Sequence, residues 1–251
     1  MFYRIPPEKK QDFRRAVDTL ADIYQGNIYA NDMLITIGRN LSFRADEKFV
    51  SSFTSSAQDE QQSSLAWRLH VLTWAAQTAL SLEGDFVDCG VLKGFCSEVV
   101  CKYLDFQNVP KQFYLYDTFA GFPERTSTEA ERNAYPSYKE IDSDALYKEV
   151  CEKFSIYPNV RVVRGIVPDS FAEASPDRIS FLHIDMNSEM AELLALEHLF
   201  DRVVAGGMIV FDDFGWSSAV NQCKAELDFM RKRGHAILEL PTGQGLVIKH
   251  A

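Results

Sequence analysis

The pattern of apolar and polar positions predicts a helical start followed by alternating strands and helices. Apolar side chains recur at helical spacing over 12–25 and again over 65–82, which is typical of amphipathic helices. The stretch 41–64 is polar and rich in Ser, Asp and Gln, and we expect a loop with a short helix there. From Gly84 onward, short apolar runs bounded by turn residues alternate with helical patterns. This alternation predicts a parallel sheet covered by helices on both faces.

Five apolar runs are predicted strands, and the chain end is a predicted β-hairpin. The predicted strands cover 85–89, 113–116, 160–163, 179–184 and 208–211, with helices at 94–104, 144–154, 189–200 and 217–233. The hairpin covers 236–249 and turns at Pro241-Thr242-Gly243-Gln244-Gly245. The predicted fold class is therefore α/β: a Rossmann-like, doubly wound, mostly parallel seven-stranded sheet with a C-terminal β-hairpin and extra N-terminal helices. We expect 1–64 to be an N-terminal extension that covers the site and 65–251 to be the α/β domain.

The charge balance argues against a nucleic-acid partner. The 26 basic and 36 acidic side chains give a formal charge of −10, and an acidic protein gains nothing from counterion release by a polyanion. The one compact basic run, at 230–233, lies at the end of a predicted helix, where cations favour the helix dipole.

The cysteines and the apolar runs favour a soluble, cytoplasmic protein. The five cysteines form no CxxC pair and have no histidine at metal spacing, so reduced, buried thiols are expected. No apolar run approaches the roughly 18 residues that a membrane span needs, and the start has no signal-peptide core.

Candidate ligand-binding residues follow the first two predicted strands, because open α/β sheets bind ligands beyond the carboxyl ends of their strands. The first strand leads into Asp88, Gly90 and Gly94, an acid with G-x-x-x-G in place of the dinucleotide fingerprint G-x-G-x-x-G. This pattern suits an amino-acid-bearing nucleoside without a pyrophosphate, whose ammonium Asp88 would take up. Asp117 ends the second strand and is placed to accept both ribose hydroxyls; a loop-capping role is the alternative.

Acidic residues also follow the fourth and fifth predicted strands. Asp185 and the pair Asp212 and Asp213 are expected at the same sheet edge. Carboxylates that close repel one another unless a cation is present, and oxygen ligands suit Mg²⁺, with Ca²⁺ or Mn²⁺ as alternatives. In the competing interpretation Asp213 caps the next helix and Asp212 faces water. A metal here would hold a substrate hydroxyl and lower its pKa.

With these motifs the sequence resembles the macrocin O-methyltransferase family, whose members modify sugar hydroxyls of natural products. The resemblance spans about residue 65 to the C-terminus and is carried by four ordered motifs: GDFVDCGV at 84–91, DTFAGFP at 117–123, HID at 183–185 and GGMIVFDDFG at 206–215. It implies S-adenosylmethionine bound by the first two motifs and Mg²⁺ held by Asp185, Asp212 and Asp213. It also implies N-terminal helical elements that help cover the site, often in an oligomer, so we expect a homo-oligomer.

The candidate donor-binding residues are Asp88, Gly90, Val91, Gly94, Ser97, Asp117, Thr118, Phe119, Gly165 and Asp185. One position departs from the family pattern, which is commonly Asp-x-Asp-Leu-Tyr after the first metal ligand. Here it is Asp185-Met186-Asn187-Ser188-Glu189, so Asn187 replaces the acid that would serve as general base, and an amide cannot accept that proton. The candidate catalytic residues are therefore Asp185, Asn187 and His183, with Glu189 or the metal alone as alternatives for activating the hydroxyl.

The expected function is metal-dependent O-methylation of a hydroxyl on a sugar or glycosylated metabolite. A catechol-like acceptor and a nucleoside-binding module without turnover are alternatives, and a nicotinamide oxidoreductase is disfavoured by the missing phosphate fingerprint. The loop 122–141 is predicted to be a lid whose aromatic side chains stack on a sugar, and Thr242 and Gln244 are expected to contact the hydroxyls of the acceptor.

Overall fold

The computed structural model describes residues 5–251. The chain divides into two compact units, one ending at His70 and the other covering Val71–Ala251, so that the boundary falls within helix α4 (Ala66–Ala79). The boundary predicted from sequence, between residues 64 and 65, stays a prediction.

Before α4, the N-terminal unit contains a β-hairpin and five helical segments within the residues that the structure describes. Its elements are η1 (Pro7–Lys9), α1 (Lys10–Ile23), β1 (Ile28–Asn31), β2 (Leu34–Ile37), η2 (Ser42–Arg44), α2 (Glu47–Ser56) and α3 (Glu60–Ser64). The hairpin turns at Asp32 and Met33, which both have left-handed φ angles, 49° and 59°. Such a turn usually has Asn or Gly at these positions, which explains why the sequence pattern did not predict it.

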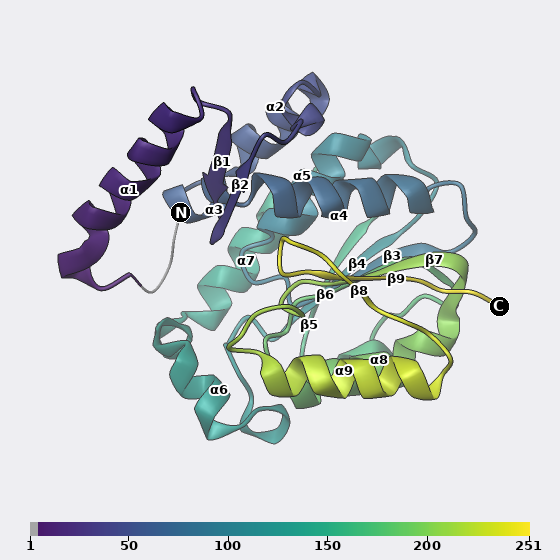
Figure 1. Ribbon diagram of the computed structural model, residues 1–251. Coiled ribbons are helices and arrows are strands. Elements are labelled where there is room, and N and C mark those ends of the chain that lie inside the picture. Colours follow the sequence, from purple (N-terminus) through teal and green to yellow (C-terminus); the bar gives the residue numbers. More distant parts are fainter. Residues whose placement is uncertain (1–4) are drawn as a thin grey trace. The chain divides into compact units, whose positions relative to one another are not determined.

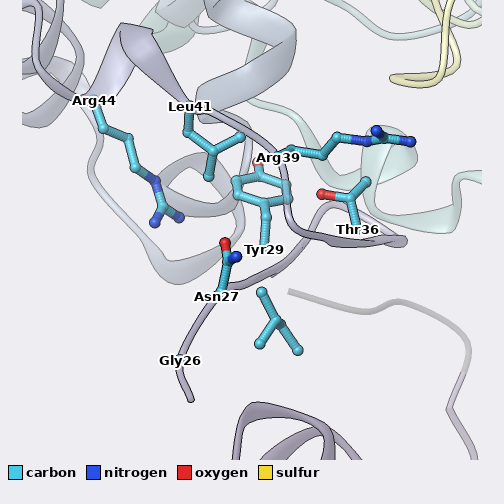
Figure 2. Close-up of a pocket in the computed structure, with 8 residues that line it drawn as sticks. Gly26, Asn27, Tyr29, Thr36, Arg39, Leu41 and Arg44 are labelled. Atoms are coloured by element: carbon cyan, nitrogen blue, oxygen red, sulfur yellow. The ribbon is translucent and has the colours of Figure 1, made fainter. Parts of the chain in front are cut away.

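A small hollow of about 150 Å³ lies beside this hairpin (Figure 2). It is lined by Gly26, Asn27, Ile28, Tyr29, Thr36, Arg39, Leu41 and Arg44. The guanidinium of Arg44 lies 5.2 Å from the ring centroid of the buried Tyr29. None of the site residues predicted from the sequence lines this hollow.

The second unit is built on a seven-stranded sheet with the order β5-β4-β3-β6-β7-β9-β8 (Figure 1). The strands are β3 (Asp85–Cys89), β4 (Phe113–Asp117), β5 (Val160–Arg164), β6 (Ile179–Ile184), β7 (Val203–Phe211), β8 (Leu238–Glu239) and β9 (Gly245–Ile248). The first five are mutually parallel, and β9 pairs antiparallel with both β7 and β8. The predicted fold class, including the closing hairpin, is confirmed.

Helices cover both faces of this sheet, with α5 on one face and α8 and α9 together on the other (Figure 1). The helices are α5 (Phe95–Leu104), α6 (Glu129–Ala134), α7 (Ser143–Phe154), α8 (Glu189–Leu199) and α9 (Val220–Lys232). Because both faces are covered, every residue of β6 is buried. None of the helices within residues 5–251 has the length and apolar character needed to cross a membrane.

The strand order places a topological switch between β3 and β6. The chain runs from β3 outward through β4 to β5, and then returns to β6 on the other side of β3. In open α/β sheets the crevice at such a point, beyond the carboxyl ends of the strands, is where ligands bind. The loops after β3 and β6 therefore flank the expected site.

Gly90 lies where these two loops come closest. Its φ is 101°, and a Cβ at this position would lie 1.9 Å from the carbonyl oxygen of Asp185. We predict that Gly90→Ala lowers the free energy of unfolding by about 3 kcal/mol or more, because the clash with backbone adds to the left-handed strain.

Gly234 is the matched control for this substitution. Its φ is 75°, and a Cβ there meets nothing within 4 Å, so Gly234→Ala should show only the strain, about 1–2 kcal/mol. Urea unfolding of both variants compares the two losses. Equal losses of unfolding free energy in the two variants would show that the close contact between Gly90 and the Asp185 carbonyl does not restrict the side chain at residue 90.

Candidate active site

The register of the sheet brings the predicted acidic residues to one edge. Asp88 on β3 lies opposite His183 on β6, and His183 lies opposite Val210 on β7. Asp185 follows the end of β6, and Asp212 follows the end of β7. The predicted convergence of the three strand ends is therefore what the structure shows.

His183 lies between two buried carboxylates. Its Nδ1 is 2.9 Å from Oδ1 of Asp88, and its Nε2 is 3.8 Å from Oδ1 of Asp212. The exposed fractions of His183, Asp88 and Asp212 are 1%, 2% and 5%. Burial alone would lower the pKa of His183, but the charges of Asp88 and Asp212 and the hydrogen bond to Asp88 raise it well above its ordinary value. The two carboxylates therefore favour the protonated ring, a form that could not accept a proton from a substrate.

Asp88 and Ser97 are engaged with each other. The Ser97 hydroxyl, on the first turn of α5, donates to Oδ2 of Asp88, while Oδ1 faces His183. Ser97 is 1% exposed. In this structure both residues fix the position of His183, and their predicted contact with the methyl donor stays a prediction.

Asp117 joins the loops that follow three neighbouring strands. Its Oδ2 accepts from the amide of Leu92 at 2.8 Å, its Oδ1 accepts from the amide of Phe119 at 2.6 Å, and its carbonyl accepts from the amide of Gly165 at 2.9 Å. Burial raises the pKa of Asp117, and the amide hydrogen bonds act in the opposite direction. The loops expected to hold the donor are thus tied together by the residue expected to contact its ribose.

The neighbouring candidates for donor binding serve mainly to shape these loops. The Thr118 hydroxyl donates to the carbonyl of Gly121 at 2.7 Å and closes the turn after β4. Phe119 is fully buried, with its ring 5.3 Å from that of Tyr147 and its amide bonded to Asp117. Gly94 has a φ of 76° at the start of α5, and Val91 is buried.

Asp185, Asp212 and Asp213 are close enough to influence one another. Burial, followed by the charges of Asp212 and Asp213, raises the pKa of Asp185 well above its ordinary value. Within residues 5–251, however, no group of three or more His, Cys, Asp or Glu side chains is arranged to hold a metal ion. The carboxylates have the chemistry that a hard cation prefers, but they are not a preformed site.

Thr242 and Gln244 do not face an acceptor, contrary to the expectation from sequence. The Gln244 Nε2 donates to Oδ1 of Asp212 at 3.1 Å, and the Thr242 hydroxyl donates to Oε1 of Gln244 at 2.9 Å. Both side chains are buried, at 0% and 4% exposure. Alternation along a short hairpin does not reveal that a neighbouring strand end supplies a carboxylate partner, so the prediction was wrong.

Aromatic side chains of the loop 122–141 gather above the acidic residues. The rings of Phe122, Tyr135 and Tyr138 form a cluster in which each pair of ring centroids is 5.4–5.6 Å apart. Burial, together with the charge of Asp185, raises the pKa of Tyr138, which places this ring near the carboxylates. The Tyr135 hydroxyl donates to Oδ1 of Asn187 at 2.6 Å.

Glu192 supports the end of β6 and was not identified from the sequence. Its Oε1 accepts from the amides of Met186 and Asn187 at 3.0 and 3.1 Å, and the side chain is 1% exposed. Burial and the neighbouring Glu226 raise the pKa of Glu192, and burial raises that of Glu226 to about 7, so the pair holds a proton near neutral pH. Its helical spacing could have predicted its burial, because Glu192 shares a helix face with the buried Ala195, Leu196 and Leu199.

The charge on His183 makes a prediction about stability and pH. Because the folded-state pKa of His183 is raised, its stabilising contribution is complete below the ordinary histidine pKa of about 6.5 and is lost as the pH rises through the folded value. We predict that His183→Gln lowers the free energy of unfolding by about 3 kcal/mol or more in mildly acidic buffer, and that the difference from wild type shrinks in alkaline buffer.

Urea unfolding over this pH range measures the difference. His198→Gln is the control, because His198 is an exposed histidine on α8. A difference between wild type and His183→Gln that does not change with pH would contradict the imidazolium assignment.

Comparisons with known proteins agree with this architecture. A curated relative, mycinamicin III 3''-O-methyltransferase of Micromonospora griseorubida, is 27% identical over 160 residues, which cover 59% of this chain and 62% of the relative. The chain thus spans less than two thirds of that relative's length.

Two solved structures share the fold. The O-methyltransferase NovP matches with a TM-score of 0.60 at 17% identity, over 73% of this chain and 80% of NovP. The calicheamicin methyltransferase CalS11 matches with a TM-score of 0.58 at 16% identity, over 98% of this chain and 95% of CalS11. The sequence profile described as macrocin-O-methyltransferase (TylF) matches residues 66–239, more than half of the chain. The resemblance seen in the four motifs is therefore confirmed, and the chain belongs to the macrocin O-methyltransferase family.

Proposed function

We propose that the chain is an S-adenosylmethionine-dependent O-methyltransferase that acts on a hydroxyl of a sugar or glycosylated metabolite. The observation that carries the proposal is the set of acidic residues gathered at the carboxyl edge of the sheet, at its topological switch: Asp88, Asp117, Asp185, Asp212 and Asp213. The methyl donor carries a sulfonium and an ammonium, and an acidic edge attracts both. A nicotinamide dinucleotide carries two phosphates, which the same edge repels.

Asp117 is the proposed ribose ligand. Each of its carboxylate oxygens accepts one backbone amide, and a carboxylate has about four lone-pair positions in all. Lone pairs are therefore left for both ribose hydroxyls. The turn from Gly90 to Gly94 lacks the G-x-G-x-x-G spacing that cradles a pyrophosphate, and we propose that it takes the amino-acid part of the donor.

Asp185 is the proposed general base. Burial, followed by the charges of Asp212 and Asp213, raises its pKa, and a higher pKa makes a carboxylate a stronger proton acceptor, while His183 is enclosed between Asp88 and Asp212 and Asn187 is an amide. Oδ1 of Asp185 accepts from Asn187 Nδ2 at 3.0 Å, which leaves Oδ2 to take the proton of the acceptor hydroxyl. Attack on the methyl carbon requires a near-linear approach, so holding the two substrates in place is the larger part of catalysis.

As an alternative way to activate the hydroxyl, we propose that Asp185, Asp212 and Asp213 hold Mg²⁺, in which case the ion and not Asp185 would acidify the acceptor. Support comes from the convergence of the three carboxylates: burial, followed by the charges of Asp212 and Asp213, raises the pKa of Asp185. Because the described residues contain no preformed cluster, these carboxylates must converge on the ion as it binds. When bound, the ion would supply Lewis-acid polarisation of the acceptor hydroxyl.

A sugar acceptor is supported by the aromatic cluster of Phe122, Tyr135 and Tyr138. Phe122, Tyr135 and Tyr138 present broad rings beside the carboxylates, and such rings pack against the apolar face of a pyranose. The named relative performs a 3''-O-methylation of mycinamicin III, in keeping with an acceptor of this class.

Calorimetric titration with S-adenosylhomocysteine tests the donor and the metal together. We predict micromolar-range binding to wild type, weakened roughly 10- to 100-fold in Asp117→Ala because charged hydrogen bonds to the ribose are lost. Mg²⁺ should release binding heat that Asp212→Ala abolishes. Asp228→Ala, which removes an exposed carboxylate on α9, is the control and should leave both signals unchanged.

Mass spectrometry of acceptors incubated with protein, donor and Mg²⁺ completes this test. A glycoside should gain a methyl group on oxygen, and a catechol should not. Absence of donor binding would overturn the methyltransferase assignment. Donor binding without a methylated product would favour a nucleoside-binding module, and equal turnover after chelation of the metal would overturn the Mg²⁺ proposal alone.

A further inference from the structure

We propose that Tyr135 and Asn187 are positioning residues that orient the carboxylate of Asp185 when the lid segment, residues 122–141, lies over the end of β6. This inference rests on the proposed function, in which Asp185 is the base. It gives Asn187, the residue that departs from the family pattern, a role that an acid at this position could not perform.

Two consecutive hydrogen bonds connect the lid segment to Asp185. The Tyr135 hydroxyl donates to Oδ1 of Asn187 at 2.6 Å, and Nδ2 of Asn187 donates to Oδ1 of Asp185 at 3.0 Å. The side-chain amide therefore accepts at one end and donates at the other. An aspartate at 187 would accept from Tyr135 but would have no donor for Asp185.

The backbone of Asn187 is held in the position that these two bonds require. Its φ is 54°, a left-handed conformation that asparagine tolerates better than most residues. Its amide donates to Oε1 of the buried Glu192 at 3.1 Å. With the backbone fixed by Glu192, the direction of the side-chain amide depends on its two partners, Tyr135 and Asp185.

The lid segment also docks on the two residues that follow Asn187. The Ser188 hydroxyl donates to the carbonyl of Thr126 at 2.5 Å, and the amide of Glu189 donates to Oε1 of Glu131 at 2.9 Å. Three consecutive residues after the end of β6 are thus bonded to the lid segment. Docking of this segment and the orientation of Asp185 are therefore parts of one connected arrangement.

The hydrogen bonds from Tyr135 to Asn187 and from Asn187 to Asp185 determine which oxygen of Asp185 accepts the proton. With Oδ1 held by the Asn187 amide, Oδ2 is the oxygen presented to the acceptor hydroxyl. Tyr135 acts here through its hydroxyl and Asn187 through its side-chain amide, and neither of these two groups touches the reacting atoms. They act through Asp185, and loss of either should lower kcat while leaving the KM for the donor unchanged.

Limited proteolysis tests the lid contact without any ligand. The lid segment contains trypsin sites at Arg125, Arg132 and Lys139. Tyr135→Phe should speed cleavage there by roughly 3- to 10-fold, the usual effect of one hydrogen bond on an opening equilibrium. Tyr103→Phe, which removes one long hydrogen bond on the surface, is the control. Cleavage of Tyr135→Phe at the wild-type rate would overturn the proposed lid contact.

Steady-state kinetics of Tyr135→Phe, Asn187→Asp and the double variant test the connection to Asp185. Each single variant should lower kcat by roughly 10- to 100-fold, as expected for a misplaced catalytic group, and the double variant should lose no more than the worse single. Asn108→Asp, at an exposed asparagine, is the control and should match wild type. Thermal unfolding of each variant shows whether it is folded.

Two kinetic results would overturn the proposal that Tyr135 orients Asp185 through Asn187. A higher kcat in Asn187→Asp would mean that an acid at this position acts as the base. Losses that multiply in the double variant would mean that Tyr135 and Asn187 act independently. If wild type itself transfers no methyl group, the proposed function fails, and the proteolysis comparison still decides whether Tyr135 holds the lid segment.

Discussion

The buried contact of His183 with two carboxylates is the interaction on which the site depends. It connects β3, β6 and β7 at the level where each strand ends. Carboxylates as deeply buried as Asp88 and Asp212 are costly unless charged or polar partners surround them. A protonated His183 places a positive charge between them, the Ser97 hydroxyl donates to Oδ2 of Asp88, and Gln244 donates to Oδ1 of Asp212, the oxygen that faces His183.

The acidic residues at this edge of the sheet form two groups, an inner layer around His183 and an outer layer that contains Asp117 and Asp185. The inner layer, around His183, is closed to solvent and fixes the strand ends. The outer layer, with Asp117 and Asp185, is half-buried and keeps carboxylate lone pairs beyond those used by Leu92, Phe119 and Asn187, so we propose it as the part that contacts a cationic ligand. After the end of β6, Glu192 accepts from the amides of Met186 and Asn187, and burial raises its pKa and that of Glu226. This separation of structural and reactive carboxylates fits a family that binds a sulfonium donor.

The fold could be predicted from sequence because its strands are short apolar runs with clear boundaries. Strands β3 and β6 were predicted at their observed bounds, and the helices between strands differ mostly by a few residues. Strand β7 begins at Val203 and not at residue 208, because Gly206 and Gly207 interrupt the apolar pattern while the backbone still pairs. The β1–β2 hairpin was missed because its turn uses Asp32 and Met33.

The residues of the site could be located from sequence, but their partners could not. Strand ends give positions, so Asp88, Asp117, Asp185 and Asp212 were found at the correct edge. Which side chains face one another depends on register and loop packing between distant segments. Neither the contact of Gln244 with Asp212 nor that of Tyr135 with Asn187 leaves a trace in local spacing. Glu192 shows the same limit, since its partners are backbone amides of another segment.

The most direct test of this account is the protonation state of His183, measured by ¹⁵N NMR of histidine-labelled protein, with His183→Gln used to assign the signal. The account predicts that both ring nitrogens carry protons at neutral pH and remain protonated well above the ordinary histidine pKa of about 6.5. A neutral imidazole at neutral pH would contradict it, because Asp88 and Asp212 would then need another source of positive charge and His183 would be free to act as a base.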